Sequence, residues 1–261
     1  MGIYVVATPK GGVGKSTTAA ELVLALAQRR RQVLAIDLDQ QGNLTARMGM
    51  TAASEVDGTT ADVLTGELDI DQAATPSPVL DGVDVLAGTH ALADTEAAPP
   101  ADLITFLRDE LPAHAGRWDE AVIDTPPSVG ALTQAGLAAA DVIIAPVTPS
   151  VEAYDQLRRL AAVLDARIAR RVNRGAQISW VVPVAFDSRT AQGRGRLLDR
   201  EIFTQLCNTY PGRVTPPVRD SVTARDAYME GLPVGAYAPG TPVANDYAEA
   251  ARVIIEGATR S

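Results

Sequence analysis

The sequence predicts an α/β fold in which helices flank a mostly parallel central sheet on both faces. Short apolar runs rich in β-branched residues alternate along the chain with longer stretches of helical periodicity, a pattern typical of a parallel sheet covered on both sides. Several of the predicted strands carry polar residues at their carboxyl ends: Thr8, Asp37, Asp39 and Asp124. Ligands of open α/β sheets bind at that edge, so we expect the functional site there.

Six strands are predicted from short apolar runs of the length and composition of buried strands. In chain order they cover residues 3–7, 33–36, 83–86, 120–123, 142–147 and 178–184. The first run lacks the basic flank and the cleavage site of a signal peptide, so we interpret it as the first strand of the sheet.

Helices are predicted between the strands from apolar residues at helical spacing, as at Leu22 and Leu26. Thr59 or Thr60 is expected to cap the second helix, and Pro112 to end the third. The stretch 89–100 lacks such a pattern and is expected to be an exposed loop. The predicted helices cover residues 16–30, 60–64, 102–111, 131–140, 152–172, 190–208 and 243–256.

Composition limits the class of protein. The chain has 261 residues, 46% of them hydrophobic, which suits one soluble globular domain spanning residues 1–261. No apolar run reaches the roughly 18 residues that a membrane span needs, and we expect a cytoplasmic protein. The single cysteine, Cys207, rules out an internal disulfide and any metal site built from several cysteines of one chain. Cys207 is expected to be buried, while His90 and His114 are expected on the surface or in loops.

The two lysines of the chain lie together in a glycine-rich turn after the first strand. The turn reads Lys10-Gly-Gly-Val-Gly-Lys15-Ser16-Thr17, and every other basic side chain is arginine. The strict pattern for a phosphate-binding loop fails, because its first glycine falls on Pro9. The strand–loop–helix context is nevertheless right for such a loop. Gly11, Gly12 and Gly14 let backbone N–H groups converge on phosphate oxygens.

Each polar side chain at the end of this loop has an expected role. Lys15 should reach the β- and γ-phosphates, the Ser16 hydroxyl should bind Mg²⁺, and Thr17 should donate to the α-phosphate. Lys10 has no such role in an ordinary phosphate-binding loop. The loop residues expected to bind the nucleotide are Gly11, Gly12, Val13, Gly14, Lys15, Ser16 and Thr17.

The glycine-rich segment resembles the deviant Walker A motif of the ParA/MinD family of ATPases. Residues 37–45 resemble the switch I segment of that family, and residues 121–128 its Walker B and switch II segment. Residues 181–190, which end Phe-Asp-Ser-Arg-Thr, resemble the strand and loop beside the nucleotide base. The resemblance runs from residue 1 to about residue 256 and is looser in the C-terminal third.

The resemblance implies an ATPase with ATP and Mg²⁺ as cofactors and a homodimer that forms on ATP binding. Lys10 would cross into the partner subunit and contact its phosphates, and Asp39 would position or polarise the attacking water. Asp37 would support Mg²⁺ through water, and Asp124 would hold it through its water shell. The catalytic residues would then be Lys10, Lys15 and Asp39, and the metal site would be Ser16, Asp37 and Asp124. Lys10 and Asp124 would also join the loop residues that bind the nucleotide.

Charge is distributed unevenly along the chain, whose net charge is −9. Residues 158–219 contain twelve arginines against four carboxylates, a balance of 12 − 4 = +8, which leaves −9 − 8 = −17 for the rest. Such a stretch by itself more often marks a solvated helix face than a nucleic-acid site. ParA proteins, however, bind DNA without sequence preference, and the resemblance favours Arg189 and Arg219 as DNA contacts.

The resulting functional hypothesis is a short ParA-type partition ATPase without an N-terminal helix-turn-helix. Its ATP dimer would coat nucleoid DNA, and a ParB-type centromere-binding partner would stimulate slow hydrolysis and release. Many relatives have Pro-Glu where this chain has Pro149-Ser150, so a contact across the dimer would be missing or supplied by Glu152 or Asp155.

Two alternatives remain open at this point. A MinD-like membrane-associated ATPase requires a basic amphipathic C-terminal tail, whereas residues 247–256 have the pattern of a helix packed on the core. A relative of the nitrogenase iron protein requires cysteines in a cluster-binding loop, whereas Cys207 lies in a helical pattern.

Overall fold

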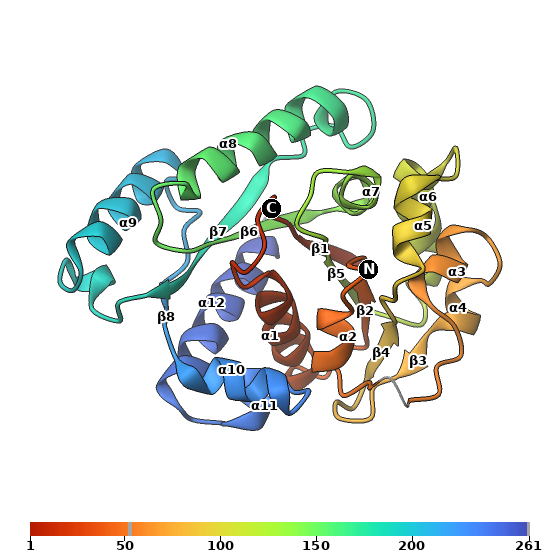
Figure 1. The fold of residues 1–261 in the computed structure, drawn as a ribbon, viewed down its shortest axis with the longest axis horizontal. Coiled ribbons are helices and arrows are strands. Elements are labelled where there is room, and N and C mark those ends of the chain that lie inside the picture. The colour runs from red at the N-terminus through yellow and green to blue at the C-terminus, as the bar shows by residue number, and fades with distance from the viewer. Residues whose placement is uncertain (52–53, 260–261) are drawn as a thin grey trace.

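A computed structural model describes residues 1–51 and 54–259, and it is built on one eight-stranded sheet (Figure 1). The strand order is β3-β4-β2-β5-β1-β6-β7-β8, and every pair is parallel except β3 with β4. The strands are β1 Gly2–Val6, β2 Val33–Asp37, β3 Thr75–Pro76, β4 Val83–Leu86, β5 Glu120–Asp124, β6 Val142–Val147, β7 Ile178–Phe186 and β8 Val218–Arg219.

Helices cover both faces of the sheet, which confirms the predicted fold class. The helices are α1 Lys15–Gln28, α2 Asn43–Arg47, α3 Thr60–Leu64, α4 Ile70–Ala73, α5 Leu92–Ala97, α6 Leu103–Glu110, α7 Ala131–Ala139, α8 Ala153–Val163, α9 Leu197–Thr209, α10 Val222–Met229, α11 Val234–Tyr237 and α12 Pro242–Ala258. Shorter 3₁₀ or π turns are η1 Leu111–His114, η2 Leu164–Ala169 and η3 Thr190–Gln192.

The two faces have separate apolar cores. One core packs α3 to α9 against the sheet, and the other packs α1, α2 and α10 to α12 against the opposite face (Figure 1). The six long strands are almost wholly buried, as expected for parallel strands covered on both sides.

The sheet brings the segments that follow β1, β2 and β5 side by side at the carboxyl ends of the strands. In the parallel register Val6 of β1 pairs with Asp124 of β5, and Asp37 of β2 pairs with the same Asp124. The loop after β1 therefore begins beside the two aspartates. This adjacency depends on strand order, because residues 37 and 124 are far apart in the chain.

The predicted helix over residues 190–208 is wrong at its N-terminal part. The structure has the short turn η3 and then α9, which begins at Leu197. Gly193 and Gly195 separate them with φ angles of 70° and 91°, a left-handed conformation that interrupts a helix. The predicted helix over residues 152–172 is not one continuous α-helix. Helix α8 ends at Val163, and the chain continues as the π turn η2.

The prediction of an exposed loop over residues 89–100 is also wrong. Helix α5 lies within that stretch, and its Leu92 is fully buried. Glu96 accepts hydrogen bonds from the backbone N–H groups of Ala131 and Leu132, at 2.9 and 2.8 Å. This carboxylate therefore caps the N-terminus of α7 from another part of the chain, which supports the loop that follows β5.

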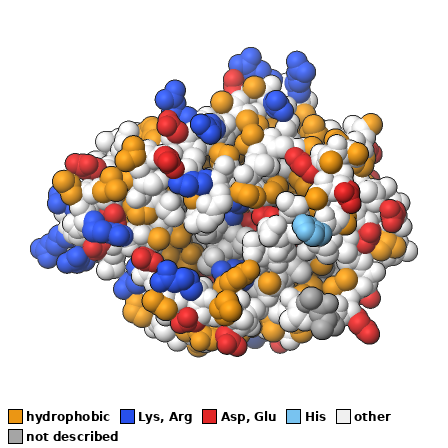
Figure 2. Space-filling model, viewed as in Figure 1, with side chains coloured by type: hydrophobic (Ala, Val, Ile, Leu, Met, Phe, Trp, Pro, Cys, Tyr) orange, Lys and Arg blue, Asp and Glu red, His pale blue; other side chains and the backbone are white. Residues whose placement is uncertain are grey.

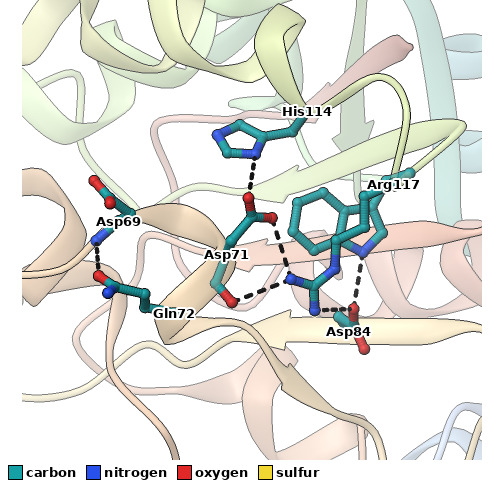
Figure 3. A network of polar contacts seen from close by, with 7 residues as sticks. Asp69, Asp71, Gln72, Asp84, His114 and Arg117 are labelled. Atoms are coloured by element: carbon teal, nitrogen blue, oxygen red, sulfur yellow. Dashed lines mark hydrogen bonds and ion pairs between the residues drawn. The ribbon is translucent and has the colours of Figure 1, made fainter.

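His114, expected on the surface or in a loop, lies partly exposed in the turn η1 and has a carboxylate partner. Its Nδ1 is 3.3 Å from a carboxylate oxygen of Asp71, which also pairs with Arg117 (Figure 3). The Arg117 guanidinium continues to Asp84 on β4, at 3.0 Å. These contacts tie α4 and η1 to the sheet edge, away from the loop after β1. Cys207 is half-buried rather than buried.

Candidate functional site

The loop after β1 forms a cradle of backbone N–H groups. Gly12 and Gly14 have φ angles of 71° and 87°, which favour glycine, and a Cβ on Gly14 would lie 3.0 Å from a methyl group of Val184. Helix α1 begins at Lys15, and its N-cap residue, Gly14, has no side chain that could cap it. The first N–H groups of a helix lack partners within the helix, so this end is suited to bind an anion.

Lys15 is buried at the start of α1, with its ammonium directed back over the loop. Its Nζ donates a 2.8 Å hydrogen bond to the carbonyl oxygen of Lys10. Burial lowers the pKa of Lys15, while the carboxylates of Asp124 and Asp39 act in the opposite direction. The ammonium is thus held among negative groups and can turn from the loop carbonyl to a bound anion.

Asp124 is a completely buried carboxylate at the end of β5. Neither of its oxygens accepts a hydrogen bond of standard geometry from residues 1–51 or 54–259, although the Ser16 hydroxyl is close enough to lower its pKa. Burial, and then the neighbouring Asp37, raise the pKa of Asp124 well above its ordinary value. A buried carboxylate without partners fits a site for a cation.

Asp37 differs from Asp124 because its two oxygens already have donors. One accepts from the backbone N–H of Asp39 at 3.0 Å, and the other from the N–H and hydroxyl of Thr45, at 2.9 and 2.8 Å. Burial raises the pKa of Asp37 to about 6, against these hydrogen bonds. The side chain therefore anchors the segment 37–45 to the end of β2.

Asp39 is held at the opening of the site. It is buried, and its Oδ1 accepts from the backbone N–H of Gln41 at 3.0 Å. Gly88 lets the chain pass close by, since a Cβ there would lie 2.7 Å from both the Asp37 carboxyl carbon and the Asp39 carbonyl oxygen. The carboxylate is thus fixed by its own backbone and lines the cavity over the loop.

Lys10 lies outside that cavity. Its side chain is 36% exposed, and its Nζ is 2.7 Å from Glu152 Oε2. The ion pair lowers the pKa of Glu152. Glu152, one of the two carboxylates considered for a contact across a dimer, therefore pairs with Lys10 within one chain.

Two adjacent cavities meet at the loop. One, of about 370 Å³, is lined by Lys15, Ser16, Asp39 and other loop residues. The second, of about 500 Å³, extends toward the end of β7 and α10, with an apolar lining that includes Val184 and Met229. The first compartment has the loop and the Lys15 ammonium, which suit a phosphate chain. The second combines apolar side chains with Arg219 and Arg225, which suits a nucleoside.

Two residues of the site were not singled out from the sequence. Arg47, at the end of α2, and Tyr228, at the end of α10, line both cavities. The Tyr228 hydroxyl is 2.9 Å from Asn43 Oδ1 on α2. Arg47 follows the segment 37–45 by two positions, which is the one signal that could have suggested it. Nothing in the sequence connects Tyr228 to Asn43, which lies 185 positions away.

The two arginines favoured for DNA contact both have carboxylate partners. Arg189 is 67% exposed and pairs with Asp187 at 3.0 Å. Arg219 is 35% exposed, pairs with Asp246 and lines the second cavity. Other arginines of residues 158–219 are exposed and form no ion pair or side-chain hydrogen bond with the described residues, among them those at positions 158, 159, 194 and 200.

Basic side chains also gather on the molecular surface. Figure 2 shows blue side chains at the left edge, over α9 and the loop before it, and at the top, with carboxylates between them.

No helix within residues 1–51 and 54–259 has the length and apolar character needed to cross a membrane.

Comparison with known proteins places this geometry among nucleotide-binding folds. Residues 1–178 match the family model described as AAA domain. The chain is 30% identical over 253 residues to the chromosome-partitioning ATPase Soj of Thermus thermophilus, with 95% of this chain and 93% of that protein covered.

Two solved structures share the fold over nearly their whole length. McdA of Cyanothece is 21% identical, with 98% of this chain and 99% of that chain covered and a TM-score of 0.84. Cobyrinic acid a,c-diamide synthase of Mycobacterium smegmatis, with bound ADP and magnesium, is 26% identical, with 97% and 93% covered and a TM-score of 0.78.

Proposed function

The chain belongs to the ParA/MinD family of P-loop ATPases, and from that premise we propose a DNA-segregation ATPase whose ATP-bound dimer binds DNA without sequence preference. The observation that carries the proposal is the separation of the two lysines. Lys15 is buried in the cavity over the loop, whereas Lys10 is half-exposed outside it. Lys15 can bind the nucleotide of its own chain, and Lys10 is left to contact the nucleotide of a second subunit.

The phosphate chain of ATP would lie on the N-terminus of α1. The backbone N–H groups of the loop and the Lys15 ammonium would hold the β- and γ-phosphates, and Thr17 would donate to the α-phosphate. Lys15 gives up its bond to the Lys10 carbonyl for a stronger charge-assisted bond. Phosphoryl transfer depends mainly on such positioning and charge neutralisation.

Mg²⁺ fits the buried carboxylate at the end of β5. Ser16 and Asp124 would hold it, the latter through the ion's water shell, with Asp37 behind them. Bound there, the ion would neutralise the developing charge on the β- and γ-phosphate oxygens. Asp37 has the further task of anchoring the segment that carries Asp39, whose carboxylate would orient the attacking water.

Lys10 would act across the dimer. Its ion pair with Glu152 is exposed on both sides, and surface ion pairs contribute little free energy, so a partner's phosphates can draw the ammonium away. A cation added to the most negative part of the transition state then accelerates hydrolysis. Hydrolysis that waits for a second subunit and for a ParB-type partner protein would be slow without them.

DNA binding would use the arginine-rich surface of the dimer. Phosphate contacts need no base readout and depend strongly on salt. Arg189 belongs to a loop whose backbone also fixes Arg194, because the Arg194 N–H donates to the Arg189 carbonyl oxygen at 3.0 Å. Two copies of this surface in an ATP dimer would raise the avidity for DNA.

Arg189→Ala and Arg219→Ala should each weaken DNA retention in the ATP state and lower the salt dependence. Loss of one phosphate contact per subunit lowers the slope of log K against log salt by about 0.9 for each contact. Filter retention of a random-sequence duplex across a salt series measures both effects. Arg252→Ala is the matched control, because Arg252 is an exposed, ion-paired arginine on α12 outside the basic stretch.

Unchanged retention in both variants would move the DNA site elsewhere on the surface. Since Arg219 lines the second cavity, ADP affinity of Arg219→Ala must be measured as well. Weaker DNA retention together with weaker ADP binding in that variant would assign Arg219 to the nucleotide and not to DNA.

The described part of the chain offers no feature that favours the MinD-like alternative. The apolar face of α12 is occupied by the core, where Tyr247, Ile254 and Ile255 are buried. Sedimentation of the protein with anionic liposomes in ATP would favour the alternative over DNA segregation.

A further inference from the structure

Arg47 is a buried arginine, and two of its guanidinium nitrogens lack a hydrogen-bond acceptor among the described residues. Its side chain lies at the end of α2, and the residue is only 6% exposed. Nε and Nη1 donate to no group in residues 1–51 and 54–259. Its guanidinium carbon lies 5.0 Å from the centre of the Tyr228 ring, a cation–π contact that orients the guanidinium.

Glu21 and Asp124 both act electrostatically on this guanidinium, but neither accepts a hydrogen bond from its Nε or Nη1. Glu21 is nearby, but its oxygens accept hydrogen bonds from the backbone N–H groups of Val234 and Gly235 at the start of α11. Burial raises the pKa of Glu21 to about 7, and Arg47 acts in the opposite direction. Keeping an arginine buried without an acceptor costs free energy. A bound anion would accept its hydrogen bonds and offset that cost.

The position of Arg47 between the two cavities determines which part of a bound ligand its guanidinium can contact. Among the described residues, Gly12, Gly14 and Thr17 of the loop line both cavities of the site, together with Arg47 and Tyr228. They therefore mark the boundary between the compartment over Lys15 and the one toward β7 and α10. In a nucleotide the α-phosphate is the group at this boundary, because it joins the phosphate chain to the nucleoside.

We propose that Arg47 binds the α-phosphate of the nucleotide, and that Tyr228 holds its guanidinium in place. The proposal rests on the proposed function, because it takes a nucleotide as the ligand of the two cavities. Asn43 completes the arrangement, since its side chain accepts from the Tyr228 hydroxyl and links α10 to α2. Tyr228 is then a positioning residue, and Arg47 a binding residue beyond the phosphate loop.

A purely structural role for Arg47 makes a different prediction about the ligand-free protein. If the cation–π contact mainly stabilised the fold, its removal would lower the unfolding temperature and leave nucleotide affinity alone. If Arg47 awaits an anion, removal relieves a buried unpaired charge, and the ligand-free protein keeps its stability while affinity falls.

The test is isothermal titration calorimetry of the protein with ADP and with inosine diphosphate, each in the presence of Mg²⁺. Arg47→Met should weaken both nucleotides by the same factor, about 10- to 100-fold, which is the loss expected for charge-assisted hydrogen bonds. The midpoint of thermal unfolding without nucleotide should not fall. Arg29→Met, an exposed arginine at the end of α1, is the control and should bind as the unaltered protein does.

Three results would overturn the proposal. They are an unchanged affinity in Arg47→Met, a factor that differs between the two bases, and a lower unfolding midpoint with normal affinity. If Arg47→Met does not fold, Arg47→Gln replaces it and must show the same equal weakening. Failure of the unaltered protein to bind either nucleotide would instead refute the proposed function.

Discussion

Lys15→Ala is expected to abolish measurable nucleotide binding. The lysine is buried, and its ammonium lies among loop and carboxylate groups with one neutral acceptor, the Lys10 carbonyl oxygen. It would exchange that bond for charge-assisted bonds to two phosphates, each contributing about 1.5–3 kcal/mol. Their loss corresponds to a Kd for ATP or ADP weakened by about 10² to 10⁴, measured by calorimetry with Mg²⁺.

The fold itself should survive this change. Alanine is a good helix former at the first position of α1, and removal of an ammonium that burial disfavours relieves a desolvation cost. Circular dichroism and the unfolding midpoint provide the control. Nucleotide affinity within threefold of the unaltered protein, in a folded Lys15→Ala, would contradict the phosphate assignment of the loop.

Lys10→Ala is expected to keep ATP binding but to lose hydrolysis. Lys10 lies outside the cavity of its own chain, so the Kd for ATP should change only a few-fold. A cation supplied in trans to a phosphoryl-transfer site accelerates hydrolysis by about 10³ to 10⁵, and the variant should lose a factor of that order. Phosphate release with ATP, Mg²⁺ and DNA measures the rate.

Glu152→Gln is the matched control for Lys10→Ala. It removes the ion pair of 2.7 Å but leaves the lysine free to act, so hydrolysis should be retained. Normal hydrolysis in Lys10→Ala would refute the role across the dimer. Equal loss in both variants would show that the ion pair itself, rather than the free lysine, supports the reaction.

The sheet and the central carboxylates could be predicted from local patterns. Buried parallel strands have continuous apolar runs, and a polar residue at the end of such a run is visible in the sequence. Strand register then brings Asp37 and Asp124 to paired positions, as expected for carboxyl ends on one edge. The glycines of the loop were recognisable because their left-handed backbone leaves a compositional signature.

Features that depend on contacts between distant segments could not be predicted in the same way. Helix α5 is short, and its role depends on Glu96 reaching the start of α7. The broken helix before α9 depends on two glycines that lie within a helical apolar pattern. Arg47 and Tyr228 meet only because α2 and α10 pack on the same face of the sheet.

Counting charges along the sequence does not show which arginines are available to contact DNA. The count of arginines over residues 158–219 ignores which of them are already paired. Arg219 has Asp246 as a partner and lines the second cavity, whereas Arg194 belongs to a loop with an exposed side chain. Local charge predicted a basic region, but the partners of each arginine are set by tertiary packing.

Retention of non-specific DNA as a function of nucleotide and salt tests the central claim most directly. We predict strong retention with ATP and Mg²⁺, little with ADP or without nucleotide, and a steep loss as salt rises. Asp39→Ala should hold the ATP state on DNA without turnover, because it keeps the binding groups and lacks the carboxylate that orients water. Equal retention with ATP, with ADP and without nucleotide would contradict the claim that ATP controls DNA binding.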